Sequence, residues 1–462
     1  MEFLRRFAGF FIRQENMDGS GTDNEDRLSS LPDSMLCEIL LKLSTKDVVR
    51  TSVLSNRWRN LWRSVPGLDL SCDDLREYNT FVSFVDRFLG FNSELCIENL
   101  KVKYQLGSAH VTRWINDVVK RRVKHLSVIA YHWSINGAHI PSTVYTCESL
   151  VTLELREATL LSPKFVFLPC LKVISLIRVK FANNLAFEML ISGSPLLESL
   201  SLVTISFENI NCFRVCSESL LRLTHFENYS IGEDLVIAID APRLRYLKLS
   251  DYDTTCVPCF IVKDLGSLVK VDMDIVFKLG YGRSFDPNDL PRINMIRDFF
   301  NGISTAKDMV ISSRTLEVIY DYLRCQPLPL FPNLSSMRIT DYKWQMLPAF
   351  LESFPRLKRL FLESCRNPPE KEGISISSGR PCFLSSLEYV EIQKPWTNPQ
   401  RKENLLSSKH RLVSYFVENS TLCLDDSTKE GESLILRRPL TTPRLSASCP
   451  VNNPQEIDSI LG

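Results

Sequence analysis

A repeated apolar pattern, L-x-x-L-x-L, constrains the fold of this chain more than any other feature of its sequence. Clean neighbouring copies begin 21, 26, 24 and 23 residues apart, and a gap of 47 between Leu197 and Leu244 predicts one degenerate copy near Leu220. The eight matching triplets are Leu150/Leu153/Leu155, Leu171/Ile174/Leu176, Leu197/Leu200/Leu202, Leu244/Leu247/Leu249, Leu268/Val271/Met273, Leu334/Met337/Ile339, Leu357/Leu360/Leu362 and Leu387/Val390/Ile392. Unrelated amphipathic strands, the alternative, would not give such regular spacing.

A period of about 20 to 29 residues is typical of leucine-rich repeats. Each copy contributes a short strand whose alternate residues point inward, while the return segment stacks on its neighbour. Because each repeat returns the chain to the same edge, the strands are expected to pair in parallel. The sequence therefore predicts an α/β solenoid of parallel strands with irregular helices. It also predicts deep burial of Leu153, Leu155, Ile174, Leu176, Leu200, Leu202, Leu247, Leu249, Leu360 and Leu362.

Polar residues alternate with the leucines in these copies. Successive side chains of a strand point to opposite faces, so the residues between the leucines should line the strand-side surface. The candidates are Thr152, Glu154, Ser175, Ser201, Arg245 and Lys248. They are expected to tolerate substitution while changing what the surface binds.

The charge balance argues against binding driven by a global field. Lys and Arg number 55 and Asp and Glu number 54, a net charge of +1. Neither nucleic acid nor an anionic membrane is therefore an expected partner, and no segment has the roughly 18 unbroken apolar residues of a membrane span. Most of the fourteen cysteines, including Cys37, Cys96, Cys147 and Cys170, sit in apolar runs and are interpreted as buried hydrophobes. With no convincing secretory leader, the cytoplasm, the nucleus or both are expected.

Few motifs indicate chemistry. Cys256 and Cys259 form a C-x-x-C motif, but zinc needs two further ligands, and the Cys212/Cys216 pair has a different spacing. Buried loop cysteines are the favoured interpretation, and no metal or cofactor is predicted. The basic run 120–124 could bind nucleic acid, although a solvated entry to a strand is favoured. With 17 glycines, no phosphate-binding loop and no nucleophile turn, nothing indicates an enzyme.

Three short helices are predicted between Arg27 and Trp62, after an acidic linker at 15–26. Pro32 suits the first turn of the first helix, whose apolar face would hold Met35, Leu36, Ile39, Leu40 and Leu43. Ser44 is expected to cap the second helix and Ser55 the third, which carries Trp58, Leu61 and Trp62. So short a unit cannot bury all its large apolar side chains, and a partner surface is expected.

These residues resemble an F-box of the plant F-box/leucine-rich-repeat type. The similarity rests on Leu31-Pro32, Val53-Leu54-Ser55, Arg57-Trp58 and Leu61-Trp62; Ser44 stands where the family often has proline. The segments 384–392 and 415–419 resemble the FBD domain, although the connection after Ser420 is shortened, so either a helical turn is lost or a strand is displaced. The predicted domains are a disordered leader (1–26), an F-box (27–65), leucine-rich repeats (66–365), a loop (366–380), an α+β FBD unit (381–449) and a tail (450–462).

The resemblance implies a substrate-recognition subunit of an SCF ubiquitin ligase. The F-box would dock a Skp-type adaptor and, through it, a cullin, while the repeats hold an unknown target protein. The implied adaptor-binding residues are Leu31, Pro32, Leu36, Ile39, Leu40, Val48, Val53, Leu54 and Trp58. Thr152, Glu154, Ser175, Ser201, Arg245 and Lys248 become the target-surface candidates. Two alternatives are a small-molecule-gated receptor of the same architecture and a scaffold whose F-box is unused.

Overall fold

The computed structural model divides the chain into two compact units, Met1–Ala182 and Asn183–Gly462. It describes residues 28–439 except for 29, 75–76, 92–95, 105–107, 132–137, 208–211, 228–235, 252–258, 264, 278–287, 343–346, 366–382, 394–412, 419 and 426–432. The predicted leader, the loop at 366–380 and the tail at 450–462 lie outside the described residues, as do Cys256 and most of the loop expected near Gly280.

The first unit begins with helices and continues as alternating strands and helices. Its helices are α2 (Asp33–Leu40), α3 (Thr45–Arg50), α4 (Tyr78–Phe91) and α5 (Ser108–Lys120), with short 3-10 helices η1 (Thr51–Val53), η2 (Leu61–Ser64), η3 (Cys72–Asp74) and η4 (Ser142–Thr146). Its strands are β1 (Gly67–Ser71), β2 (Asn99–Tyr104), β3 (His125–Ala130), β4 (Ala138–Ile140), β5 (Thr152–Leu160) and β6 (Val173–Phe181). Parallel pairing runs in the order β1, β2, β3, β5 and β6.

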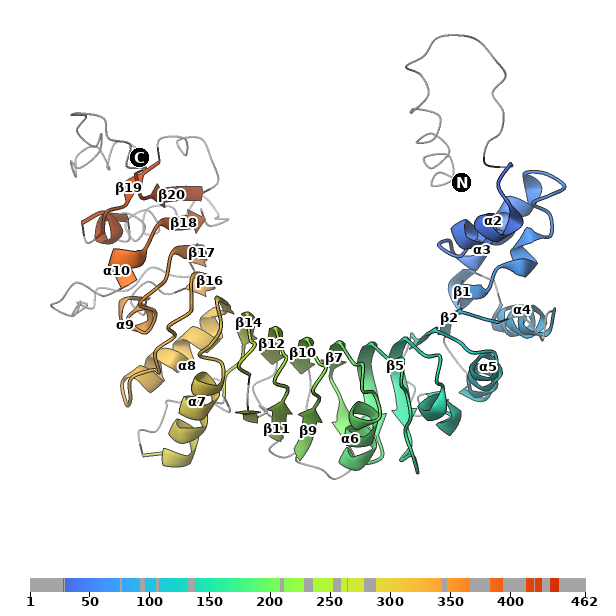
Figure 1. Cartoon of the computed structure of the whole chain (residues 1–462), viewed down its shortest axis with the longest axis horizontal. Helices are drawn as coiled ribbons and strands as arrows, with labels where there is room; N and C mark the ends of the chain where they lie inside the picture. Colours follow the sequence, from blue (N-terminus) through green and yellow to red (C-terminus); the bar gives the residue numbers. More distant parts are fainter. Residues whose placement is uncertain are drawn as a thin grey trace, which may run out of the picture. The chain divides into compact units, whose positions relative to one another are not determined.

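The second unit continues the parallel pattern. One run of strands comprises β7 (Ser199–Val203), β10 (Arg222–Glu227), β12 (Tyr246–Asp251), β14 (Lys270–Asp274), β15 (Asp308–Ile311), β16 (Ser336–Tyr342), β17 (Arg359–Cys365) and β18 (Tyr389–Gln393), each parallel to the next. A second parallel sheet comprises β9 (Cys212–Cys216), β11 (Val236–Asp240) and β13 (Cys259–Lys263). Other elements before the C-terminal segment are β8 (Ser206–Phe207), α6 (Asn184–Ser192), α7 (Leu290–Gly302), α8 (Ser313–Leu323), α9 (Leu347–Leu351) and α10 (Phe383–Ser386). Figure 1 shows β7, β10, β12 and β14 side by side, with β9 and β11 as a separate layer.

The predicted repeat core is confirmed. All ten apolar residues chosen from the pattern are 0 to 1% exposed. Inward residues of neighbouring strands lie directly opposite one another in the sheet: Leu223 pairs with Leu247, and Leu247 with Val271. The degenerate copy expected near Leu220 is β10, and the helix expected through Ile296, Phe299 and Phe300 is α7.

The structure also contains repeat strands that the strict leucine pattern missed. In four of them, β-branched residues or alanine take the first position: Val65 before β1, Ile97 before β2, Val123 before β3 and Ala306 before β15. All four side chains are buried. The same geometry is therefore maintained wherever an apolar side chain of suitable volume is available, whether or not it is leucine.

A chain of aromatic rings fills the interior of the second unit. Phe213 contacts Phe187 and His225, and His225 contacts Phe260. Contacts continue through Phe299, Phe277, Phe300, Phe331 and Phe354 to Phe350, with centroids 4.8 to 6.4 Å apart. Edge-to-face pairs at such distances add to the free energy of area burial. These rings connect the return segments of successive repeats.

The last strands turn from parallel to antiparallel pairing, which agrees with the predicted α+β C-terminal unit. β20 (Ser433–Arg437) is antiparallel to both β18 and β19 (Cys423–Leu424). The helix at 413–418 is followed by a strand of only two residues, so β19 remains paired beside β20 despite the short connection.

The repeat core makes a stability prediction. Leu247→Ala is expected to lower the free energy of unfolding by about 2 to 5 kcal/mol, because it leaves a cavity beneath β12. Thr224→Ala on β10, which alters the strand face, should cost much less. Urea denaturation followed by circular dichroism measures both. Equal effects of the two substitutions would contradict the assignment of Leu247 to the core.

Candidate functional site

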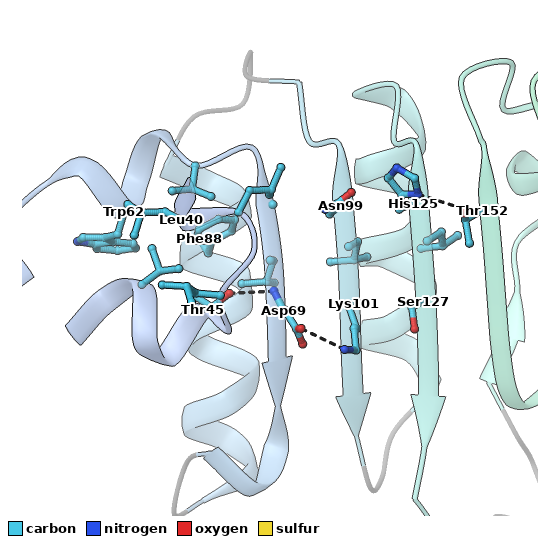
Figure 2. A pocket seen from close by; sticks show the side chains of 18 of the residues that line it. Leu40, Thr45, Trp62, Asp69, Phe88, Asn99, Lys101, His125, Ser127 and Thr152 are labelled. Carbon is cyan, nitrogen blue, oxygen red and sulfur yellow. Dashed lines mark hydrogen bonds and ion pairs between the residues drawn. The ribbon is translucent and has the colours of Figure 1, made fainter. Parts of the chain in front are cut away.

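The strand face of the first unit carries an ordered set of polar side chains. Asp69 accepts a hydrogen bond from Lys101 at 3.1 Å, and Ser127 donates to Glu154 at 2.7 Å. The ring Nδ1 of His125 lies 3.1 Å from the hydroxyl of Thr152. Figure 2 shows Asp69 on β1, Lys101 on β2 and Ser127 on β3, on strands that lie side by side. Of the predicted surface residues, Thr152, Glu154 and Ser175 all lie on β5 and β6 and are half-buried.

The other three predicted surface residues belong to the second unit. Ser201 lies on β7 and Lys248 on β12, whereas Arg245 precedes β12 and is exposed. The amine of Lys248 lies 3.0 Å from the Asp272 carboxylate, and the hydrogen bond between them raises the pKa of Lys248 above its usual range. The six candidates thus form two groups of three, one in each unit.

An aromatic and cationic cluster on the strand face escaped the sequence analysis. The guanidinium of Arg338 lies 4.7 Å from the ring centre of Phe361, and that of Arg437 lies 5.6 Å from the ring centre of Tyr389. The two rings are themselves 5.6 Å apart. We call these four residues the aromatic cluster. A signal was available in the sequence, because Phe361 stands between the leucines of its repeat, where other copies carry polar residues.

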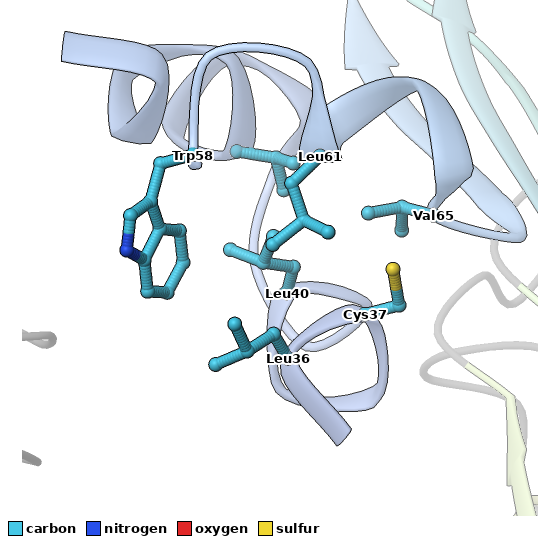
Figure 3. Close-up of a cluster of buried hydrophobic side chains, with 7 residues drawn as sticks. Leu36, Cys37, Leu40, Trp58, Leu61 and Val65 are labelled. Atoms are coloured by element: carbon cyan, nitrogen blue, oxygen red, sulfur yellow. The ribbon is translucent and has the colours of Figure 1, made fainter. Parts of the chain in front are cut away.

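The N-terminal helices form their own small core. The hydroxyl of Ser44 accepts a hydrogen bond from the backbone N–H of Asp47, which confirms the predicted cap of α3. Seven buried residues pack together in this core: Leu36, Cys37, Leu40, Val48, Trp58, Leu61 and Val65. Figure 3 shows the indole of Trp58 beside the leucines of α2. The prediction of a third helix after Ser55 is wrong over most of its length. Residues 56–60 form turns, and the 3-10 helix η2 begins only at Leu61.

The nine predicted adaptor-binding residues divide between core and surface. Leu36, Leu40, Val48 and Trp58 are at most 4% exposed. Their assignment to a contact surface is therefore corrected: they pack the helices together. Leu31 and Ile39 are half-buried, while Pro32, Val53 and Leu54 are exposed.

The exposed apolar set of this segment comprises Pro32, Met35, Val53 and Leu54. Val53 is 80% exposed, and Met35, which helical spacing places on the apolar face of the first helix, is 52% exposed. Arg57 connects the two stretches that carry the set, because its guanidinium donates to the Leu31 carbonyl and to the Asp33 carboxylate. Large exposed apolar patches are typical of interaction sites, and this set is the candidate for one in the N-terminal segment.

A buried carboxylate lies where β12 ends. Asp251 is 1% exposed; it accepts a hydrogen bond from the backbone N–H of Val276 at 3.2 Å, and its Oδ1 lies 3.7 Å from an Arg314 nitrogen. Arg314 also donates to the backbone carbonyl of Asp251 and pairs with Asp274 at 2.9 Å. Burial raises the pKa of Asp251 to about 7, because removal from water destabilises the charged carboxylate. The arginine joins the start of α8 to the ends of two strands.

Other motifs carry no site in the described part of the chain. Groups of His, Cys, Asp and Glu arranged to hold a metal ion do not occur among the described residues. Cys37 and Cys147 are buried as expected, but Cys96 and Cys170 are exposed, which corrects their assignment as buried hydrophobes. The basic run 120–124 ends just before β3. Arg121 donates a hydrogen bond to the Leu89 carbonyl, and Lys124 pairs with Glu98. Within the described ranges, every helix falls short of the length and apolarity that crossing a membrane requires.

Comparisons with known proteins identify both the N-terminal helical segment and part of the repeat region. A family model described as "F-box domain" matches residues 28–69, and one described as "FBD-associated F-box protein At5g56370, LRR repeats" matches residues 111–262. The chain is 49% identical to F-box/LRR-repeat protein 13 of Arabidopsis thaliana, over 95% of this chain and 98% of that protein. It is 48% identical to an F-box/FBD/LRR-repeat protein of the same plant, over 95% and 98% of the two chains. It is 50% identical to an FBD-associated F-box protein, over 93% and 96%.

Asp251 makes a prediction about the pH dependence of stability. Its raised pKa means that the folded state retains a proton which the unfolded state loses near pH 4, so this group's contribution to stability falls as pH rises from about 4 to about 7. The free energy of unfolding of Asp251→Asn, compared with that of the native chain, should therefore rise by roughly 1 to 3 kcal/mol when the pH is raised from 5 to 8. Urea denaturation at both pH values tests this. Asp272→Asn, which removes a strand-face carboxylate, is the control. If the stability difference between Asp251→Asn and the native chain were the same at pH 5 and pH 8, the raised pKa of Asp251 would be contradicted.

Proposed function

Because this chain belongs to the plant F-box/FBD/leucine-rich-repeat family, we propose that it is the substrate-recognition subunit of an SCF ubiquitin ligase. Its F-box binds a Skp-type adaptor and thereby a cullin, and its repeats bind a target protein. Catalysis then belongs to other subunits, and the receptor works by raising the effective concentration of target lysines near them. The proposed place of action is the cytoplasm, the nucleus or both.

One observation carries this proposal: the segment matching an F-box folds as a small helical unit with apolar side chains left in water. Pro32, Met35, Val53 and Leu54 are exposed, whereas the core beneath them is closed. A scaffold with an unused F-box would be favoured if the chain's own repeats covered these residues. Their exposure supports docking of a partner instead.

The strand faces are the proposed target surface. Aromatic residues and arginine dominate the binding energy of many protein interfaces, and the aromatic cluster presents two of each on neighbouring strands. Glu363 pairs with Arg338, and Asp425 with Arg437, which holds the guanidinium groups in place. In the first unit, Thr152, Glu154 and Ser175 supply polar contacts that position a partner.

The adaptor is tested through the exposed residues. Replacing Val53 and Leu54 together by aspartate should abolish pull-down of the Skp adaptor, because buried charge at an apolar interface is strongly destabilising. The double variant Leu31→Ala/Pro32→Ala is expected to weaken binding in the same direction. Leu330→Asp, which changes a side chain 64% exposed in the second unit, is the matched control. Circular dichroism should show every variant folded. Unchanged adaptor binding by the first variant would refute the docking surface.

The target surface is tested by comparing bound proteins. Phe361→Ala should lose the proteins that accumulate on the native receptor when the proteasome is inhibited, while adaptor binding stays unchanged. The effect follows from the loss of an aromatic anchor, which often costs more than about 2 kcal/mol of binding free energy. Quantitative mass spectrometry after affinity purification measures both. Retention of every target would exclude the aromatic cluster from the binding surface.

A further inference from the structure

The strand face of the second unit carries a row of cationic side chains at the edge where its parallel strands begin. Its four cations, Arg222, Lys270, Arg359 and Arg437, are all exposed. Residues of this row lie directly opposite one another on neighbouring strands from β7 to β20. We call the following nine residues the basic row: Ser199, Arg222, Tyr246, Lys270, Asp308, Ser336, Arg359, Tyr389 and Arg437.

Three of these cations have no carboxylate partner within the part of the chain that the structure describes. Arg222, Lys270 and Arg359 form no ion pair there, whereas Arg437 lies 3.2 Å from Asp425. With four cations and one carboxylate, the basic row has a net charge of +3, compared with +1 for the entire chain. The row is therefore a local source of positive potential on an otherwise balanced molecule.

The positive excess ends at the next row along the same strands. In that row Lys248 and Arg338 are balanced by Asp272 and Glu391. Lys248 and Asp272 pair with each other at 3.0 Å. Because alternate residues of a strand are about 6.5 to 7 Å apart, the cationic band is narrow. It fits a single extended chain rather than a broad anionic surface.

The spacing of the cations along the row favours carboxylates distributed over a polypeptide. Neighbouring strands lie about 4.7 to 4.9 Å apart, so Arg222 and Lys270, two strands apart, are separated by roughly 9 to 10 Å. Arg359 and Arg437 repeat this spacing, with a tyrosine between the cations in both pairs. One phosphate group would engage at most one pair. The seven strand spacings from Arg222 to Arg437 amount to roughly 34 Å, the length of about ten extended residues.

Nucleic acid also carries distributed negative charge, but it fits the neighbouring carboxylates poorly. Asp308 lies within the row, and Asp272 and Glu391 lie beside it. A continuous phosphate backbone would place negative charge against all three. A polypeptide can instead place neutral or cationic residues at these points, because its charges are set residue by residue.

We propose that the basic row binds an acidic segment of the target polypeptide, about ten residues long, whose carboxylates pair with the four cations. The proposal rests on the proposed function, since it names the chemistry of the target that the repeats hold. Tyr246 and Tyr389, both half-buried, supply ring surface between the cations. Asp308 selects against a negative charge at the middle of the segment.

A rhodamine-labelled peptide of ten residues, alternating glutamate and serine, tests the charge requirement on the purified full chain. Fluorescence polarisation should give a dissociation constant on the order of 10 to 100 μM at about 0.05 M NaCl. Binding should weaken at least about tenfold at about 0.5 M NaCl, because salt screens exposed charges. The same peptide with glutamine in place of glutamate should bind at least about tenfold more weakly than the acidic peptide at low salt.

A double variant places the binding on the basic row. Arg222→Gln/Lys270→Gln should weaken the acidic peptide about fivefold, as the loss of two exposed ion pairs predicts. Neither residue belongs to the aromatic cluster. Arg292→Gln/Arg297→Gln is the matched control, because it removes the same charge from α7, which packs against β13 through Phe299 and Phe260. The control should bind the peptide like the native chain.

The carboxylate of the row allows a test in the opposite direction. Asp308→Asn should strengthen binding of the acidic peptide about two- to threefold, because it removes the row's one repulsive charge. A gain of affinity cannot result from misfolding. Asp298→Asn, which removes an exposed carboxylate from α7, is the control and should leave the affinity unchanged.

The outcomes that overturn the proposal are distinct. Equal binding of the glutamine peptide, equal loss in the two double variants, or no gain in Asp308→Asn would each refute recognition of an acidic segment. Tighter binding of a single-stranded oligonucleotide or of phosphatidylserine vesicles, lost in Arg222→Gln/Lys270→Gln, would assign the row to nucleic acid or membrane and refute it as well.

Failure of the proposed function is measured separately. The peptide titrations need no adaptor, so loss of adaptor binding by the native chain would refute the SCF assignment without affecting them. The link to the target is tested by affinity purification under proteasome inhibition. Arg222→Gln/Lys270→Gln should lose the accumulated proteins and retain the adaptor. Retention of every target by this variant would refute the basic row as the target's binding site.

Discussion

The joint between adjacent repeats is the interaction on which the rest of the structure depends. At each joint within a unit, one backbone carbonyl accepts hydrogen bonds from two successive N–H groups of the next repeat, as Leu221 accepts from Arg245 and Tyr246 at 2.9 and 3.1 Å. The same arrangement recurs at Glu98 and Lys124 in the first unit. It aligns the inward apolar rows, so each repeat buries its leucines against its neighbour. A flat face of alternate side chains remains on the other side for binding.

The sequence predicts this core well and the layer behind it poorly. The leucine pattern is strong because inward side chains recur with the geometry of the joint, and even a non-leucine copy is accommodated: β10 places His225 where leucine is expected, and burial lowers the pKa of that ring to about 4. The second sheet keeps the same period, since β9, β11 and β13 begin 24 and 23 residues apart, but its strands contain no leucine and therefore fall outside the leucine pattern. The aromatic chain through Phe299 and Phe331 joins residues whose proximity depends on how the return segments pack.

The apolar face of the first N-terminal helix contains both buried and exposed side chains, and helical spacing does not tell them apart. Helical spacing groups Met35 with Leu36 and Leu40, yet the structure buries the two leucines and exposes Met35. Periodicity defines an apolar face about 100° wide or more, and it does not say which edge of that face meets the core. The assignment depends on where Trp58 packs, and Trp58 lies in a stretch of turns that helical spacing does not describe.

Gly67 links these helices to the repeats. A Cβ at this position would come within 2.4 Å of a Leu41 methyl and 3.1 Å of the Asn99 Cβ, so a larger residue would require the Leu41 side chain to move. Leu41 and Asn99 both line a cavity of about 230 Å³ in the first unit, as do Leu40 and Val48 of the F-box core. Interiors packed this closely transmit displacement, so the packing of the N-terminal helices and the positions of β1 and β2 constrain one another.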